Sequence, residues 1–264
     1  MTVKELAESL NLVPEVIDTV TQYDRDTDYT VISESCQMLL APSTWDGGVK
    51  ALQEYCCDDP KGMKILAIYL HLITETYEKY RQMGIPDEIF YATMGFIPRF
   101  LNSHKQAWGE YAFTWAWWMP RQISMNEFRV GEFEYEFFED NGVKKIWIHI
   151  PSDADLARGN IEAVYPFLKD YFPEYAEAQI VCDSWLLSPA LKELLPDKSN
   201  IIAFQNQFKV TRTDWDSPWF MGWIWSRSDM PMEELPERTT LQRNVKKHLI
   251  VGGKIGSAYG EYIH

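Results

Sequence analysis

One histidine of the chain could act as the general base for an amine. His149 lies at the end of the alternating stretch Ile146–Ile150, and an Asn141-Gly142 pair joins this stretch to an earlier alternating one that begins near Glu132 and Glu134. This pattern predicts a β-hairpin that sets His149 opposite Glu132 or Glu134, depending on the loop length. Because imidazoles titrate near neutral pH, a histidine oriented by a carboxylate could deprotonate an amine. The alternative is a histidine that only forms hydrogen bonds inside a sheet.

Reactive side chains also follow the next apolar run. Ala178–Leu187 reads as a buried strand, and Cys182, Asp183 and Ser184 lie at its carboxyl end, where open α/β sheets bind ligands. Cys182 could be a nucleophile only if His149 lay within hydrogen-bond reach and lowered the pKa of the thiol. A buried structural cysteine is the alternative.

A glycine-rich basic segment is the candidate for binding phosphates. The chain from residue 238 to residue 254 holds five basic residues and no acidic one. The candidate anion-binding residues are Arg243, Lys247, Gly252, Gly253 and Lys254. Thr239 and Gln242 also fit a capping box, so the glycines equally suit the end of a helix. Both interpretations remain open at this point.

The secondary structure that must position these residues changes from helices to strands along the chain. Helical spacing runs from residue 3 to about 118, and an aromatic stretch ending at Pro120 precedes the alternating strands. We therefore expect two domains, a helical one at 1–124 and a sheet domain at 125–264.

In the second domain the patterns predict further elements. They indicate a helix over 152–171 with a kink at Pro166, a short helix over 190–195, strands over 202–212 and 219–226, and a helix that starts at Thr239 and ends at Gly252. Tyr259 and Tyr262 lie in a tail that is either disordered or supplies a proton to a departing thiolate.

Two further groups of side chains allow structural and binding interpretations. Gln205 and Gln207 share a face of the predicted strand 202–212 and could bind polar ligand atoms, although structural roles are the simpler interpretation. The tryptophans at even spacing fit a sheet face that packs on helices, or an aromatic platform for a sugar or acyl chain: Trp215, Trp219, Trp223 and Trp225.

Composition narrows the range of partners. The chain has 264 residues and a net charge of −14, which disfavours binding to nucleic acids and acidic membranes. No apolar run is long enough to span a membrane and no signal sequence opens the chain, so we expect a cytoplasmic protein. The four cysteines lack metal-ligand spacing, so we expect reduced thiols and no metal.

The densest motifs resemble a known family. Cys182–Pro189 runs into Leu194–Ile201, His149-Ile150-Pro151 lies upstream, and Leu241-Gln242-Arg243 with Gly252-Gly253 lies downstream. Together these motifs resemble bacterial two-domain proteins with a helical N-terminal domain and a GNAT-like C-terminal acyltransferase domain. The resemblance implies an all-helical domain followed by a mixed twisted sheet flanked by helices, an α+β or α/β fold.

The resemblance also implies a reaction. GNAT enzymes pass an acyl group from acyl-CoA or acetyl-CoA to an amine, and they bind the pyrophosphate on a glycine-rich loop. The corresponding segment, Pro151–Leu156, lacks these glycines and carries Asp153 and Asp155. We therefore expect an acyl-CoA-dependent N-acyltransferase with a degenerate phosphate loop and a small-molecule amine or acyl acceptor. In this reaction His149 or a carboxylate of Glu132 or Glu134 would receive the amine proton, and backbone N–H groups near Cys182 would polarise the thioester carbonyl. The alternatives are a non-catalytic ligand-binding or scaffold protein that keeps the fold, and a carbohydrate-binding role for the tryptophans. The oligomeric state stays open.

Overall fold

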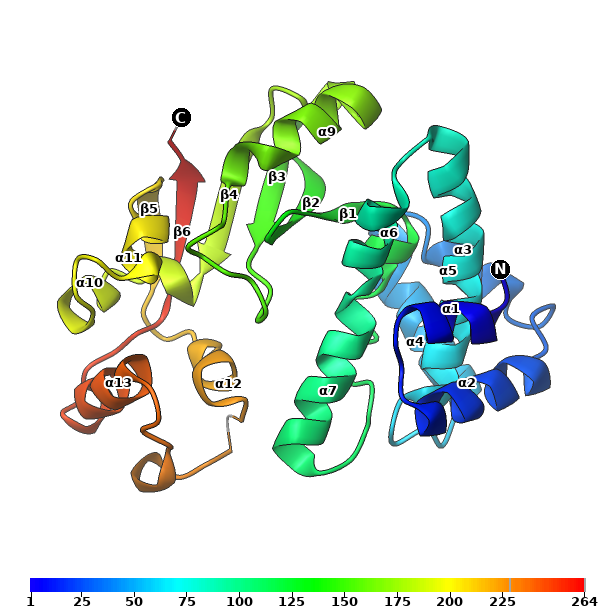
Figure 1. The fold of residues 1–264 in the computed structure, drawn as a ribbon, viewed down its shortest axis with the longest axis horizontal. Helices are drawn as coiled ribbons and strands as arrows, with labels where there is room; N and C mark the ends of the chain where they lie inside the picture. The colour runs from blue at the N-terminus through cyan, green and yellow to red at the C-terminus, as the bar shows by residue number, and fades with distance from the viewer. Residues whose placement is uncertain (228, 264) are drawn as a thin grey trace. The chain divides into compact units, whose positions relative to one another are not determined.

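A computed structural model describes residues 1–227 and 229–263 of the chain. Contacts within the chain divide it into two compact units, Met1–Val130 and Gly131–His264 (Figure 1). The division falls after Val130, where the strand β1 ends, whereas the change of pattern in the sequence predicts it after residue 124. Among the described residues, no helix is both long and apolar enough to cross a membrane.

The N-terminal unit is built from helices. It contains α1 (Val3–Ser9), α2 (Pro14–Asp26), α3 (Ser33–Met38), η1 (Pro42–Thr44), α4 (Trp45–Cys56), α5 (Met63–Met83), α6 (Asp87–Met94), α7 (Phe96–Trp108), α8 (Pro120–Ile123) and β1 (Glu127–Val130). Helix α5 is its longest, and both carboxylate oxygens of Asp59 accept N–H groups from its first turn. Its apolar side chains, spaced three and four residues apart, are buried, as the helical pattern predicts.

The C-terminal unit contains a mixed sheet with short helices. Its elements are β2 (Phe133–Asp140), β3 (Val143–His149), η2 (Ile161–Ala163), α9 (Val164–Tyr171), η3 (Pro173–Tyr175), β4 (Gln179–Ser184), η4 (Trp185–Leu187), α10 (Leu191–Leu194), α11 (Asn200–Gln205), β5 (Phe208–Asp214), α12 (Phe220–Trp225), η5 (Met232–Glu234), α13 (Thr240–Ile250) and β6 (Ser257–Tyr262). The strands of this unit lie in the order β2-β3-β4-β6-β5 (Figure 1). Only β3 and β4 pair in parallel; the other neighbours in this order pair antiparallel. The predicted mixed sheet flanked by helices is confirmed.

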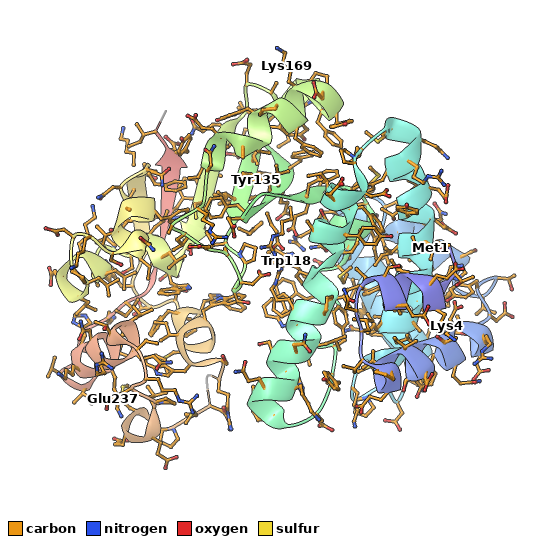
Figure 2. The ribbon with its side chains drawn as sticks, viewed as in Figure 1. Met1, Lys4, Trp118, Tyr135, Lys169 and Glu237 are labelled. Atoms are coloured by element: carbon orange, nitrogen blue, oxygen red, sulfur yellow. The ribbon has the colours of Figure 1, made fainter. Side chains whose placement is uncertain are left out.

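The first hairpin forms as its turn residues predict. Asn141 and Gly142 both adopt positive φ, 53° and 81°, which a tight two-residue hairpin turn requires. The alternation then sends Tyr135 and Ile148 to one buried face of the sheet. On that side the hydroxyl of Tyr135, labelled in Figure 2, donates to the carbonyl of Ile161 at 3.0 Å. This hydrogen bond ties the sheet to the segment that leads into α9.

The last helices form a second apolar core. Ile202, Phe220, Ile224 and Val245 are buried together, so α11, α12 and α13 share one cluster. The capping box of Thr239 and Gln242 is present at the start of α13, and Gly252, with φ 86°, follows its end. These two predictions are confirmed.

Several predicted elements of the second unit are wrong. The segments expected as strands over 202–212 and 219–226 contain the helices α11 and α12, with strand only from Phe208. In place of the helix expected from residue 152, the 3-10 helix η2 begins at Ile161 and α9 begins at Val164. Pro166 lies in the first turn of α9, where N–H groups have no partner within the helix, so it causes no kink of the expected kind. The C-terminal tail is the strand β6, which lies between β4 and β5.

Candidate functional site

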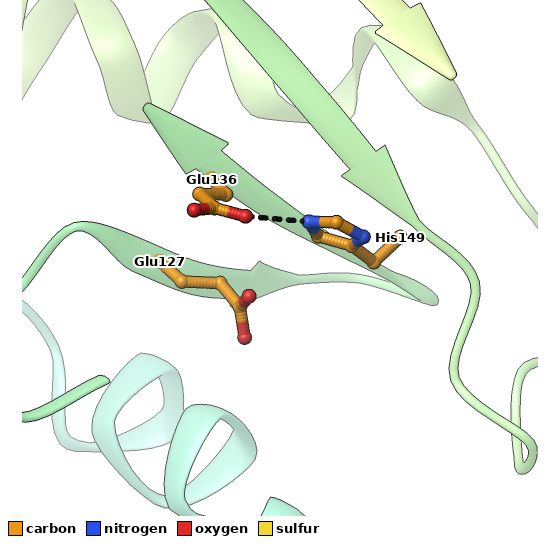
Figure 3. Close-up of side chains that lie close together, drawn as sticks. All are labelled: Glu127, Glu136 and His149. Carbon is orange, nitrogen blue, oxygen red and sulfur yellow. Dashed lines mark hydrogen bonds and ion pairs between the residues drawn. The ribbon is translucent and has the colours of Figure 1, made fainter. Parts of the chain in front are cut away.

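The hydrogen-bonded pair His149 and Glu136 is the centre of the site (Figure 3). Nε2 of His149 lies 2.9 Å from Oε2 of Glu136, and the two side chains are 25% and 11% exposed. A carboxylate can only accept, so Nε2 carries the hydrogen and the lone pair of the neutral ring lies on Nδ1. This arrangement fixes the ring of His149 and gives it the tautomer of a general base.

The sequence pattern predicts a different partner for His149, either Glu132 or Glu134. In the register of β2 and β3, Glu134 lies directly opposite His149 and Glu136 opposite Trp147. Glu134 and Glu136 are both buried and share the face of His149, but the hydrogen bond runs on the diagonal to Glu136. Glu132 lies before β2, and its carboxylate accepts the N–H of Asp155 at 2.9 Å. Alternation alone could have named Glu136, because it shares the face of Glu134.

The pairing of β3 with β4 ends before either strand does. Strand β3 pairs with β2 up to His149, and β4 pairs with β6 up to Ser184. The register between β3 and β4, however, ends at Trp147↔Val181. Beside His149, therefore, the carboxyl ends of the neighbouring parallel strands β3 and β4 are no longer paired with each other. This is the edge of the sheet where α/β folds bind ligands.

Cys182 lies on the other face of the sheet. Val181 is paired with Trp147 and so shares the face of His149, which turns the next residue, Cys182, to the opposite side. Cys182 is fully buried, and this burial raises the pKa of its thiol. The nucleophile hypothesis required contact with His149, and this geometry contradicts it in favour of a packing role. Ser184 caps the turn that follows, since its hydroxyl accepts the N–H of Leu186 at 3.2 Å.

Several N–H groups of the loop after β3 have acceptors within the protein. Asp155 N–H donates to Glu132, and Ala157 N–H donates to the Asp155 carboxylate at 2.9 Å. The N–H groups of Arg158 and Gly159 bind the carbonyl of Asp155. With two aspartates and these bonds, the loop does not form the cradle of N–H groups that holds a pyrophosphate in GNAT enzymes. The expected degeneracy of this loop has a structural basis.

The basic segment near α13 is also used by the fold. Arg243 donates to the Glu237 carbonyl and the Thr240 hydroxyl, both at 3.1 Å. Lys254 pairs with Asp216 at 2.6 Å. Gly252 and Gly253 follow the end of α13, and a Cβ on Gly253 would overlap the ring of His248. Lys247 is exposed on the helix. The geometry favours the capping interpretation of this segment.

The structure also places the remaining polar and aromatic candidates. Gln205 is buried in α11, where its Nε2 donates to the carbonyls of Leu186 and Ser188. Tyr262 donates its hydroxyl to Glu162 at 3.1 Å, so it has a structural partner. The tryptophans lie on and around α12 rather than on a strand: Trp215, Trp219 and Trp223 are exposed, whereas Trp225 is buried.

Glu127, drawn in Figure 3, belongs to the N-terminal unit. Its buried carboxylate accepts a hydrogen bond from Trp118 Nε1 at 3.1 Å and another from the side-chain amide of Gln122. The aromatic segment before Pro120 thus supplies a donor to a carboxylate of its own unit.

Comparisons with known proteins agree with this architecture. The model of an N-acyltransferase N-terminal domain matches residues 1–125, and the model of a GNAT-like C-terminal domain matches residues 99–262. Two solved structures, an acyltransferase in complex with decanoyl-CoA and teicoplanin and an acyltransferase in complex with CoA and 10C-teicoplanin, are each 18% identical to the chain with TM-scores of 0.69. In both comparisons 99% of each chain is covered. A comparison with curated proteins found no match. The chain belongs to the family that joins an N-acyltransferase N-terminal domain to a GNAT-like C-terminal domain.

Proposed function

We propose that the protein is an acyl-CoA-dependent N-acyltransferase that transfers an acyl group from a coenzyme A thioester to a small-molecule amine. The observation that carries the proposal is the early end of the β3–β4 ladder at Trp147↔Val181, beside the Glu136–His149 pair. Where two parallel strands part, the extended arm of coenzyme A can lie along a strand edge, as extended peptides do. Membership of the family and the acyl-CoA complexes of the similar structures support the same substrate.

His149 receives the proton in this reaction. A primary amine is protonated at neutral pH and must lose one proton before its lone pair can attack a carbonyl carbon. Glu136 accepts from Nε2, so Nδ1 takes that proton, and the carboxylate stabilises the imidazolium that results. The pair therefore supplies a base together with the group that orients it.

The bonds and protons then balance without a further reactant. The amine nitrogen forms a bond to the thioester carbonyl carbon, and the tetrahedral intermediate breaks its bond to sulfur. The thiolate of coenzyme A leaves and takes up the proton held on His149, while the second proton, which the attacking nitrogen still carries in the tetrahedral intermediate, passes to water. The products are an amide and free coenzyme A. Cys182 takes no part, because it lies on the opposite face and is fully buried.

Binding and turnover test the proposal separately. Isothermal titration with acetyl-CoA and decanoyl-CoA measures binding, and a thiol-release assay with a panel of amines measures transfer. We expect at least one thioester to bind and to release thiol in the presence of an amine. Absence of binding at millimolar thioester would contradict the proposal. Binding without release under any of these conditions would support the non-catalytic alternative.

A further inference from the structure

The face of the sheet that carries His149 also carries a row of polar and aromatic side chains across β4, β6 and β5. Asp183 of β4 lies opposite Tyr259 of β6, and Tyr259 lies opposite Arg212 of β5. Asp183 is two residues beyond Val181, just as His149 is two residues beyond Trp147, the partner of Val181. Asp183 and His149 therefore stand at equivalent positions on the two strands that part, and both point to the same side of the sheet.

The carboxylate of Asp183 is held in place but remains accessible. Its Oδ1 accepts the hydroxyl of Ser257 at 2.7 Å, and its Oδ2 lies 3.6 Å from the guanidinium of Arg212. The side chains of Asp183 and Arg212 are 42% and 72% exposed. An ion pair at this distance and exposure contributes little free energy, so another cation can displace the arginine.

Two aromatic rings lie on the same face of the sheet as this carboxylate. Tyr259 meets Trp147 edge to face, with ring centroids 5.6 Å apart, and Arg212 lies 5.5 Å above the ring of Tyr259. A cation already rests against this aromatic surface, and an ammonium group finds the same attraction there. The chain's net charge of −14 favours the approach of cations over anions.

We propose that Asp183 binds the ammonium group of the acyl acceptor, with Ser257 fixing the carboxylate and the rings of Trp147 and Tyr259 lining the subsite. The acceptor class is then a primary amine that is cationic at neutral pH, rather than an alcohol or an anion. Asp183 holds the ammonium group on the strand beside that of His149, which takes its proton. This assignment rests on the proposed transfer from an acyl-CoA thioester.

Amine kinetics of an Asp183→Asn variant test the assignment. The asparagine can still accept from Ser257, so the fold is retained, while the charge is lost. We expect the KM for amines to rise about tenfold, the loss that corresponds to one charge-assisted contact of about 1.4 kcal/mol. We expect kcat to change less than about threefold and the acyl-CoA affinity to stay unchanged, because Asp183 acts on the acceptor.

A matched control and a second variant sharpen the test. Asp229, which pairs with Arg227 at 2.7 Å on the surface, provides the control Asp229→Asn, for which amine KM should be unchanged. Arg212→Gln removes the competing cation and should lower the amine KM. Matched alcohols, in which OH replaces the amine, should be poor acceptors for the native protein.

The outcomes separate this inference from the proposed function. Failure of the native protein to bind any acyl-CoA refutes the proposed function and the inference with it. Binding of acyl-CoA with no acylation of any amine in the panel likewise refutes the proposed transfer to an amine and the inference with it. An unchanged amine KM in Asp183→Asn, with native turnover of the amine, overturns the inference alone. Alcohols that react as well as amines also overturn it, because a carboxylate offers an alcohol no ionic advantage.

Discussion

The imidazole of His149 forms its hydrogen bond with Glu136, although Glu134 is the residue directly opposite it in the hairpin. In an antiparallel pair, diagonal neighbours lie within reach of long side chains. A glutamate and a histidine span that diagonal at 2.9 Å. The hairpin thus presents two buried carboxylates on the face of one imidazole, and the hydrogen bond of Nε2 runs to Glu136.

Replacing the two glutamates one at a time should separate their roles. Glu136→Gln keeps the shape but replaces a charged acceptor with a neutral amide, which orients the ring less well and stabilises the imidazolium less. We expect kcat for acyl transfer to fall about tenfold to a hundredfold. Glu134→Gln is the matched control in the same strand and should stay within about threefold of native. A larger loss for Glu134→Gln than for Glu136→Gln, measured by thiol release, would reverse this assignment.

Removal of the imidazole should have the largest effect on turnover. His149→Ala and His149→Gln remove the imidazole base, and loss of general base catalysis costs about 10² to 10⁴ in rate. Coenzyme A affinity, measured by titration calorimetry, should stay within about twofold because the ring acts on the amine. Near-native turnover in both variants would show that the proton leaves by another route.

The sequence predicts the hairpin and the first parallel pair because their signals are local. Asn141-Gly142 requires positive φ, and the alternation in β2 and β3 separates a buried face from a polar one. The choice between Glu134 and Glu136 is not local in this sense, because both share a face and side-chain rotamers decide which one reaches His149.

The alternating pattern gives a wrong prediction for the tryptophan-rich segment around α12. Trp219, Trp223 and Trp225 fit a strand at even spacing, yet Trp219 and Trp223 also lie four residues apart, as on one face of a helix. The second core decides between the two, since Phe220 and Ile224 must both enter it. Such a preference arises from tertiary packing and is invisible in a single short segment. The strand β6 was not predicted for a related reason: its stability comes from pairing with β4 and β5, which are distant in the sequence.

The reactivity of the cysteines tests directly which thiols are exposed and which are buried. Cys57 is exposed, whereas Cys36, Cys56 and Cys182 are buried. Burial raises the pKa of both Cys36 and Cys56 to about 11, and it also raises that of Cys182. At pH 8 we expect one thiol to react rapidly with Ellman's reagent and the other three to react only on unfolding. Cys57→Ser should abolish the rapid phase. A rapid phase that persists in Cys57→Ser and disappears in Cys182→Ser would place Cys182 in an accessible site.

Two neighbouring lysines of α13 should differ sharply when replaced. The ammonium of Lys246 is almost buried and donates to the carbonyls of Glu233 and Leu235, both at 2.9 Å, while pairing with Glu237 at 3.0 Å. Lys246→Met leaves these acceptors without a donor, so the free energy of unfolding should fall by about 2 to 4 kcal/mol.

Lys247→Met is the matched control for this change, because Lys247 is exposed on the next position of the same helix. Its effect on stability should stay within about 0.5 kcal/mol in urea unfolding monitored by tryptophan fluorescence. The same variant tests the basic segment as a phosphate site. If the segment serves to cap and anchor α13, coenzyme A should bind Lys247→Met with native affinity. A fivefold or greater loss of affinity in a variant of unchanged stability would instead assign the coenzyme's phosphates to this helix, since the only change is one exposed charge.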